Sequence, residues 1–207
     1  QKRADSKKIP LRTTFAVVGG MFVATGCAGL LAEQCFEKLL AGLTGSSTPA
    51  AAIVLTVYFI GLALGALLYG RYRRSEWKPV RVYGYLEAGI GAWTLFLLLT
   101  YPQMIGLFAP VLMMGADHFW VLQSLRFMVA CLWIIPPTVL MGATFPAVVD
   151  ALESFRIPNP RRAMARFYAL NLVGAIIGTL VGPYGTFPAW GLHGTLMFTA
   201  VIDITVA

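Results

Sequence analysis

Three polar side chains interrupt long apolar stretches of the sequence: Glu87, Asn171 and Asp203. A carboxyl group in a low-dielectric environment must bind a proton or pair with a positive charge. Two carboxyls and an amide at one depth in a membrane would form a polar layer suited to a cation. A structural interpretation is also open, with Glu87 protonated or capping a neighbouring helix and Asn171 joining two helices.

A second polar group is expected near the opposite membrane boundary. Arg126 lies inside an apolar stretch and needs a counter-charge, for which Glu33 is the predicted partner. His118 and His193 could ligate a haem or a metal, which would make the chain a redox subunit. Histidines at a membrane boundary are usually solvated, so we predict no metal and no cofactor in this chain.

The composition places these residues in a membrane protein. The 207 residues are 58% hydrophobic and 12% charged, whereas a soluble domain is roughly 25% charged. The net charge of +7 comes from short basic clusters between apolar stretches, so we expect no nucleic-acid partner. The expected partners are the lipid bilayer and other membrane helices, in a homo-oligomer or a larger membrane complex.

The apolar stretches predict an all-α integral membrane fold with six transmembrane helices after a basic segment, residues 1–12. The predicted spans are about 13–33, 50–69, 82–101, 118–149, 164–183 and 189–207. The fourth stretch is longer than the ~30 Å core, so Pro136 and Pro137 are predicted to break it. Residues 103–117 lack Lys and Arg and contain Pro110, which predicts a re-entrant or interfacial segment.

Basic residues set the expected orientation. Five Lys or Arg precede the first span, five follow the second and four precede the fifth, against one in the opposite connections. The N-terminus and the two basic loops are therefore expected in the cytoplasm, and six spans return the C-terminus there. Glu87, Asn171 and Asp203 then all lie roughly 10 Å from the cytoplasmic boundary. A chain that begins at Gln1 and ends in an apolar stretch is expected to be a fragment.

Glycines at four-residue spacing predict close helix packing. Gly61 and Gly65 form one such pair, and Gly174, Gly178 and Gly182 recur in the fifth span. On a helix these residues make one flat seam where another backbone can approach closely. Asn171 lies three residues before this second series, so its amide is expected to face protein rather than lipid.

Several strings of the sequence occur in a recognisable order. They are EQCFEKLLAGLTGSSTPAAAIVLTVYFIGLALGALLYGR, YLEAGIGAW, PPTVLMGATFP, RFYALNLVGAIIGTLVG and WGLHGT. From about Gly26 to its end, the chain resembles the membrane domain of fused spermidine-synthase-like proteins. In these bacterial polypeptides a multi-span domain precedes a soluble aminopropyltransferase-like domain.

This resemblance implies a location in the bacterial inner membrane and a role in anchoring, and in feeding, a cytoplasmic enzymatic domain. It also suggests a polyamine as the cation for Glu87, Asn171 and Asp203. The enzymatic half of the family binds its adenosyl substrate through a Gly-rich turn after a strand. The glycines of this chain lie inside predicted spans, so no catalytic residue is predicted here.

Two other function classes stay open. A transporter-like bundle for a small cation is favoured by the buried acids and by the expected broken helices. It is disfavoured by a count of only six spans without an evident internal repeat. A non-catalytic structural subunit of a larger membrane complex is also compatible with the glycine seams.

Overall fold

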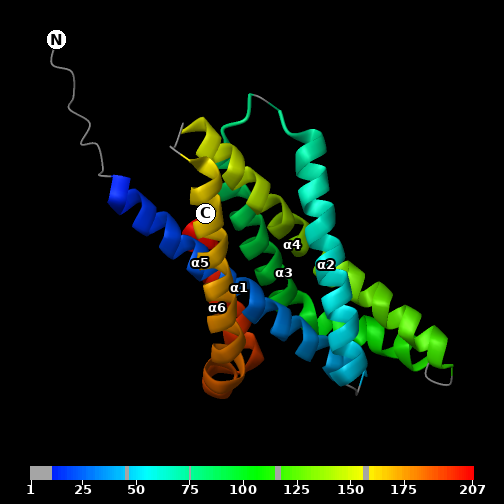
Figure 1. The fold of residues 1–207 in the computed structure, drawn as a ribbon. Coiled ribbons are helices and arrows are strands. Elements are labelled where there is room, and N and C mark those ends of the chain that lie inside the picture. Colours follow the sequence, from blue (N-terminus) through cyan, green and yellow to red (C-terminus); the bar gives the residue numbers. More distant parts are fainter. Residues whose placement is uncertain (1–10, 45–46, 75, 115–117, 156–158) are drawn as a thin grey trace, which may run out of the picture.

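A computed structural model describes residues 11–44, 47–74, 76–114, 118–155 and 159–207 (Figure 1). These residues form six α-helices and one π-helical turn, and they contain no strand. The elements are α1 (Leu11–Thr44), α2 (Ser47–Tyr72), α3 (Pro79–Met114), α4 (Phe119–Ser154), α5 (Pro160–Val181), η1 (Gly182–Thr186) and α6 (Phe187–Val206). The all-α prediction is confirmed for the described residues, and most of the predicted basic segment, residues 1–10, lies outside them.

Among the described residues, five helical segments, not six, are long and apolar enough to cross a membrane. They are Phe15–Gly42, Ala50–Tyr72, Pro79–Val111, Phe119–Ser154 and Pro160–Val206. The predicted count is wrong because the expected spans 164–183 and 189–207 fall within one of these segments, Pro160–Val206, in which η1 follows α5 without an intervening loop. Gly191 leaves the helical conformation within this segment, with φ of 66°, and the chain turns back after η1, so that α6 packs against α1 and α3 (Figure 1).

The first helix extends well beyond its predicted end. The predicted span 13–33 stops at Glu33, whereas α1 continues to Thr44 and the apolar segment to Gly42. Glu33 therefore lies inside the helix rather than at its boundary.

The third helix also continues past its predicted end. α3 passes through Pro102 and Pro110 to Met114, so the separate re-entrant or interfacial segment predicted at 103–117 is wrong. Its residues up to 114 are the last turns of α3, and 115–117 lie outside the described residues. A helix that ended inside hydrocarbon would expose several unpaired backbone groups. A helix that continues through a proline loses only about one hydrogen bond. Continuation of α3 therefore costs less free energy than ending the helix inside hydrocarbon.

The fourth helix is not broken at Pro136 and Pro137, as was predicted. A proline has no N–H to donate to the carbonyl four residues earlier, so Pro137 deprives the Trp133 carbonyl of its helical donor. The indole Nε1–H of Trp93 on α3 donates to this carbonyl at 3.0 Å. A hydrogen bond from the neighbouring helix thus replaces the one that α4 loses, and α4 remains continuous.

The glycine series on α5 brings it against α1. A Cβ at Gly174 would meet the backbone carbonyl of Val23, and one at Gly178 would meet that of Cys27. Because the residue numbers rise together, α1 and α5 run parallel. Gly182 continues the series and faces the side-chain amide of Gln34.

The glycine pair on α2 brings it against α4 in the same way. A Cβ at Gly61 would meet the Thr138 side chain, and one at Gly65 would meet the Val139 carbonyl. Gly142 on α4 faces the backbone of α2 in return. The bundle therefore contains two close parallel pairs, α1 with α5 and α2 with α4.

Trp93→Phe removes the donor to the Trp133 carbonyl and should lower the free energy of unfolding in detergent by about 1–3 kcal/mol. In a Pro137→Ala background the restored backbone N–H can serve that carbonyl, so the same substitution should cost much less. Trp120→Phe is the matched control, because Trp120 is 79% exposed. An equal cost of Trp93→Phe in both backgrounds would show that this hydrogen bond does not compensate for Pro137.

Gly174→Ala should destabilise the chain by about 1–3 kcal/mol, because the added methyl group overlaps the backbone of α1. Gly20→Ala on α1 is the control, since a Cβ there has nothing within 4 Å. Thermal unfolding in detergent compares the two variants. Equal stability of the two would refute the predicted packing role of the seam.

Candidate functional site

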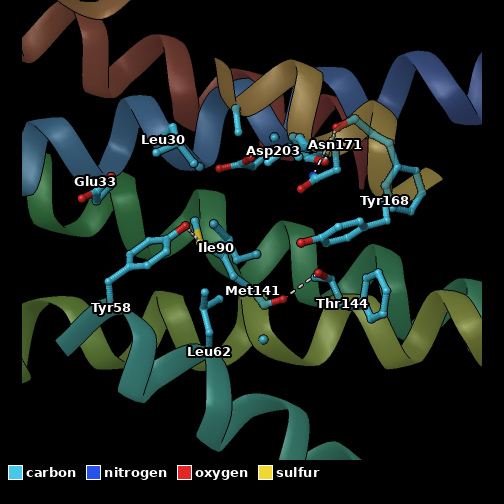
Figure 2. A pocket seen from close by; sticks show the side chains of 18 of the residues that line it. Leu30, Glu33, Tyr58, Leu62, Ile90, Met141, Thr144, Tyr168, Asn171 and Asp203 are labelled. Carbon is cyan, nitrogen blue, oxygen red and sulfur yellow. Dashed lines mark hydrogen bonds between the residues drawn. The ribbon is translucent and has the colours of Figure 1, made fainter. Parts of the chain in front are cut away.

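A cavity of about 590 Å³ lies between the helices and is open on one side, and all six α-helices contribute to its wall. Its lining includes Glu87, Asn171 and Asp203, the three residues of the predicted polar layer, and also Glu33 (Figure 2). The structure therefore brings together four polar residues that are far apart in the sequence.

Glu87 on α3 and Asp203 on α6 form the acidic centre of the cavity. The backbone of Ala207 lies against Gly84, and the two helices are antiparallel, so the residues one turn inward come opposite each other. Both acidic residues are only 3% exposed. Because the two positions face each other, the carboxyl groups would repel each other if both were charged. This pair concentrates negative charge in the interior.

Asn171 reaches the same level from α5. The side-chain Nδ2 of Asn171 donates to the backbone carbonyl of Phe22 on α1 at 3.3 Å, and the backbone carbonyl of Asn171 lies against Gly26. This hydrogen bond joins two helices, which is what the structural interpretation of Asn171 requires. Since Asn171 also lines the cavity, it can hold the helices together and face a ligand at once.

Glu33 lines the cavity two turns further along α1. The seven residues from Gly26 to Glu33 correspond to about 10 Å along a helix. Tyr58 of α2 lies between the two levels, with its hydroxyl 3.5 Å from the position of a Cβ on Gly29. That hydroxyl donates to the Met141 sulfur at 3.7 Å. The acidic groups therefore occur at two levels of the cavity, with a tyrosine between them.

The described lining of this cavity has three carboxyl groups and no Lys, Arg or His. Six aromatic side chains share the wall: Phe22, Tyr58, Phe59, Tyr83, Phe145 and Tyr168. Acidic groups without a basic neighbour in the wall attract a cation or must be protonated. Aromatic faces add favourable contacts with a cation. The cavity therefore suits a positively charged molecule that also has apolar parts.

A second cavity of about 440 Å³ adjoins the first, and Phe145 and Tyr168 line both. The two rings meet edge to face, with their centroids 5.8 Å apart. Glu153 and Arg161 also line the second cavity, where α4 ends and α5 begins. The aromatic pair is therefore the wall between the acid-lined cavity and this end of the bundle.

One buried acid escaped the sequence analysis. Asp150 on α4 pairs with Arg73 Nε at 2.9 Å, and the Tyr69 hydroxyl donates to the same carboxylate oxygen at 3.0 Å. Asp150 is 8% exposed, and the two partners lie at the end of α2. An acid within an apolar stretch was the available signal, but its partner depends on how α2 packs against α4.

Other residues singled out in the sequence have separate places. Arg126 is buried on α4 at 7% exposure, and its ion pair with Glu33 stays a prediction. His118 precedes α4, and His193 lies on α6. The described residues contain no group of three or more metal-ligating side chains.

Glu87→Gln should raise the melting temperature of the ligand-free chain by about 2–4 °C at neutral pH, because the substitution removes a desolvated charge and its repulsion with Asp203. Thermal unfolding in detergent and amine-free buffer measures the change. Glu153→Gln, on the exposed end of α4, should leave the melting temperature unchanged. A lower melting temperature in Glu87→Gln would instead identify the carboxyl as a structural hydrogen-bonding group.

The sequence is similar to two bacterial enzymes. It is 28% identical over 204 residues to polyamine aminopropyltransferase 2 of Streptomyces coelicolor, which covers 96% of this chain and 34% of that protein. It is 24% identical over 188 residues to polyamine aminopropyltransferase 1 of the same organism, at 90% and 32% coverage. No family model and no solved structure matches the chain. The chain thus spans about a third of the length of its curated relatives, and its predicted resemblance is confirmed as similarity to polyamine aminopropyltransferases.

Proposed function

We propose that this chain is the membrane domain of a polyamine-aminopropyltransferase-like protein and anchors a soluble enzymatic domain to the bacterial inner membrane. The observation that carries the proposal is the coverage: nearly all of this chain matches only a third of each relative. The described part of this chain is helical and has five segments apolar enough to cross a membrane. The transfer chemistry would then reside in the remaining two thirds.

The arrangement of the helix ends supports a C-terminus on the cytoplasmic side of the membrane, where a soluble enzymatic domain could follow. Figure 1 shows the end of α2, the start of α3, the end of α4 and the start of α5 at one end of the bundle. The exposed Arg73 and Arg161 lie at this end, which we assign to the cytoplasm by the positive-inside rule. Ala207 lies against Gly84 near the start of α3. An enzymatic domain following Ala207 would therefore begin on the cytoplasmic side.

The acid-lined cavity supports a role beyond anchoring. Its carboxyl groups have no basic residue among the described lining, so they favour a bound cation. We extend the proposal accordingly: the membrane domain binds a cationic amine and supplies it to the enzymatic domain. In this proposal the second cavity, at the end assigned to the cytoplasm, would lie between the binding site and that domain.

A transporter-like function is the second candidate, because the cavity is lined by all six α-helices. It predicts uptake of a labelled amine into liposomes that contain this chain, with loss of uptake in Glu87→Gln. The feeding role predicts binding without uptake. A structural subunit in a larger complex predicts neither, and co-purification of other membrane proteins would support it.

The anchoring role is tested on the polypeptide encoded by the complete gene. Aminopropyltransferase activity should be found in the membrane fraction and remain there after alkaline washing. In a variant that lacks residues 1–207, the activity should be found in the soluble fraction. A separate soluble enzyme serves as the fractionation control. Activity that stays membrane-bound without residues 1–207, or a polypeptide with no enzymatic domain, would overturn the proposal.

A further inference from the structure

We propose that the acid-lined cavity binds a linear oligoamine in an extended conformation, with one terminal ammonium at Glu87 and Asp203 and the other at Glu33. This inference rests on the proposed amine-binding role and adds the class of ligand and its orientation. It depends on the two acidic levels of one cavity (Figure 2).

The spacing of the two levels selects the length of the ligand. The seven residues that separate Gly26 from Glu33 place the levels about 10 Å apart. An extended chain advances roughly 1.2 Å per single bond, so terminal ammonium groups at this distance are separated by about eight or nine bonds. Spermidine has roughly nine such bonds, whereas a four-carbon diamine has about five and spans about 6 Å.

The wall between the two levels matches the middle of such a molecule. Leu30 precedes Glu33 by one turn and Ile90 follows Glu87 by one turn, and both line the cavity (Figure 2). These side chains can cover methylene groups. Tyr58 lies between the levels and is 8% exposed. Its hydroxyl oxygen can accept a hydrogen bond from an internal ammonium, and its ring can contact the charge.

Two rival explanations of the acidic groups make different predictions. A single inorganic cation binds oxygen ligands within about 2.0–2.6 Å. It would therefore bind at one acidic level of the cavity and make no contact with the other. Alternatively, the predicted pair between Glu33 and Arg126 would neutralise Glu33 within the protein. Under either explanation Glu33 would not contribute to the recognition of an amine.

The test compares spermidine with butylamine by calorimetric titration of the purified chain in detergent. The wild-type chain should bind spermidine at least about tenfold more tightly than butylamine, because a second charge pair, at the half-buried Glu33, adds to affinity. Glu33→Gln should abolish this preference by weakening spermidine alone. Glu87→Gln should weaken both amines, and Glu76→Gln, at an exposed residue outside the cavities, should weaken neither.

The Glu33→Asp variant tests whether the loss of preference in Glu33→Gln reflects misfolding. The aspartate keeps the negative charge and shortens the side chain by one methylene. It should retain part of the preference for spermidine, and the melting temperature of every variant is measured alongside. Binding of butylamine with no preference for spermidine, or an unchanged preference in Glu33→Gln, would overturn the inference and leave the cation site standing. Absence of binding for both amines would overturn the amine-binding role itself.

Discussion

Hydrocarbon offers no hydrogen bonds, so a chain inside a membrane must satisfy its backbone from within. The described part of this chain follows that constraint throughout. α3 continues through two prolines, and α4 continues through three. The π-helical turn η1 extends α5, and the reversal to α6 is confined to a single non-helical residue, Gly191. Even the carbonyl released by Pro137 receives a donor from the adjacent helix.

The two close parallel pairs shape the space that remains. Glycine lets α5 lie directly on α1 and α2 lie directly on α4, so little side-chain volume is needed at these seams. Side chains from both pairs, together with α3 and α6, then surround one cavity. The acids lie on that cavity because a charge facing hydrocarbon would be far more costly. Close packing at the glycine seams and the cavity between the helices are thus two results of the same helix arrangement.

Helical rise and chain direction made part of the site predictable. Glu87, Asn171 and Asp203 were placed at one depth by counting residues from the span ends, and they line one cavity. The expected breaks at Pro102 and Pro137 were wrong because they treated proline as it behaves in water, where a broken helix end is solvated. Glu33 was expected at a boundary because α1 was taken to end there, eleven residues before Thr44. The roles of Tyr58 and Asp150 depend on which helices pack together, which the apolar pattern does not encode.

The hydrogen bond from Trp93 to the Trp133 carbonyl has a consequence for biosynthesis. The acceptor on α4 is satisfied only when α3 stands beside it. Ribosomes synthesise the N-terminal part of a chain first, so the Trp93 indole of α3 is already made when α4 emerges. If the genetic order of α3 and α4 were reversed, α4 would enter the membrane before its donor was made, and hydrocarbon would offer the Trp133 carbonyl no hydrogen bond in the meantime.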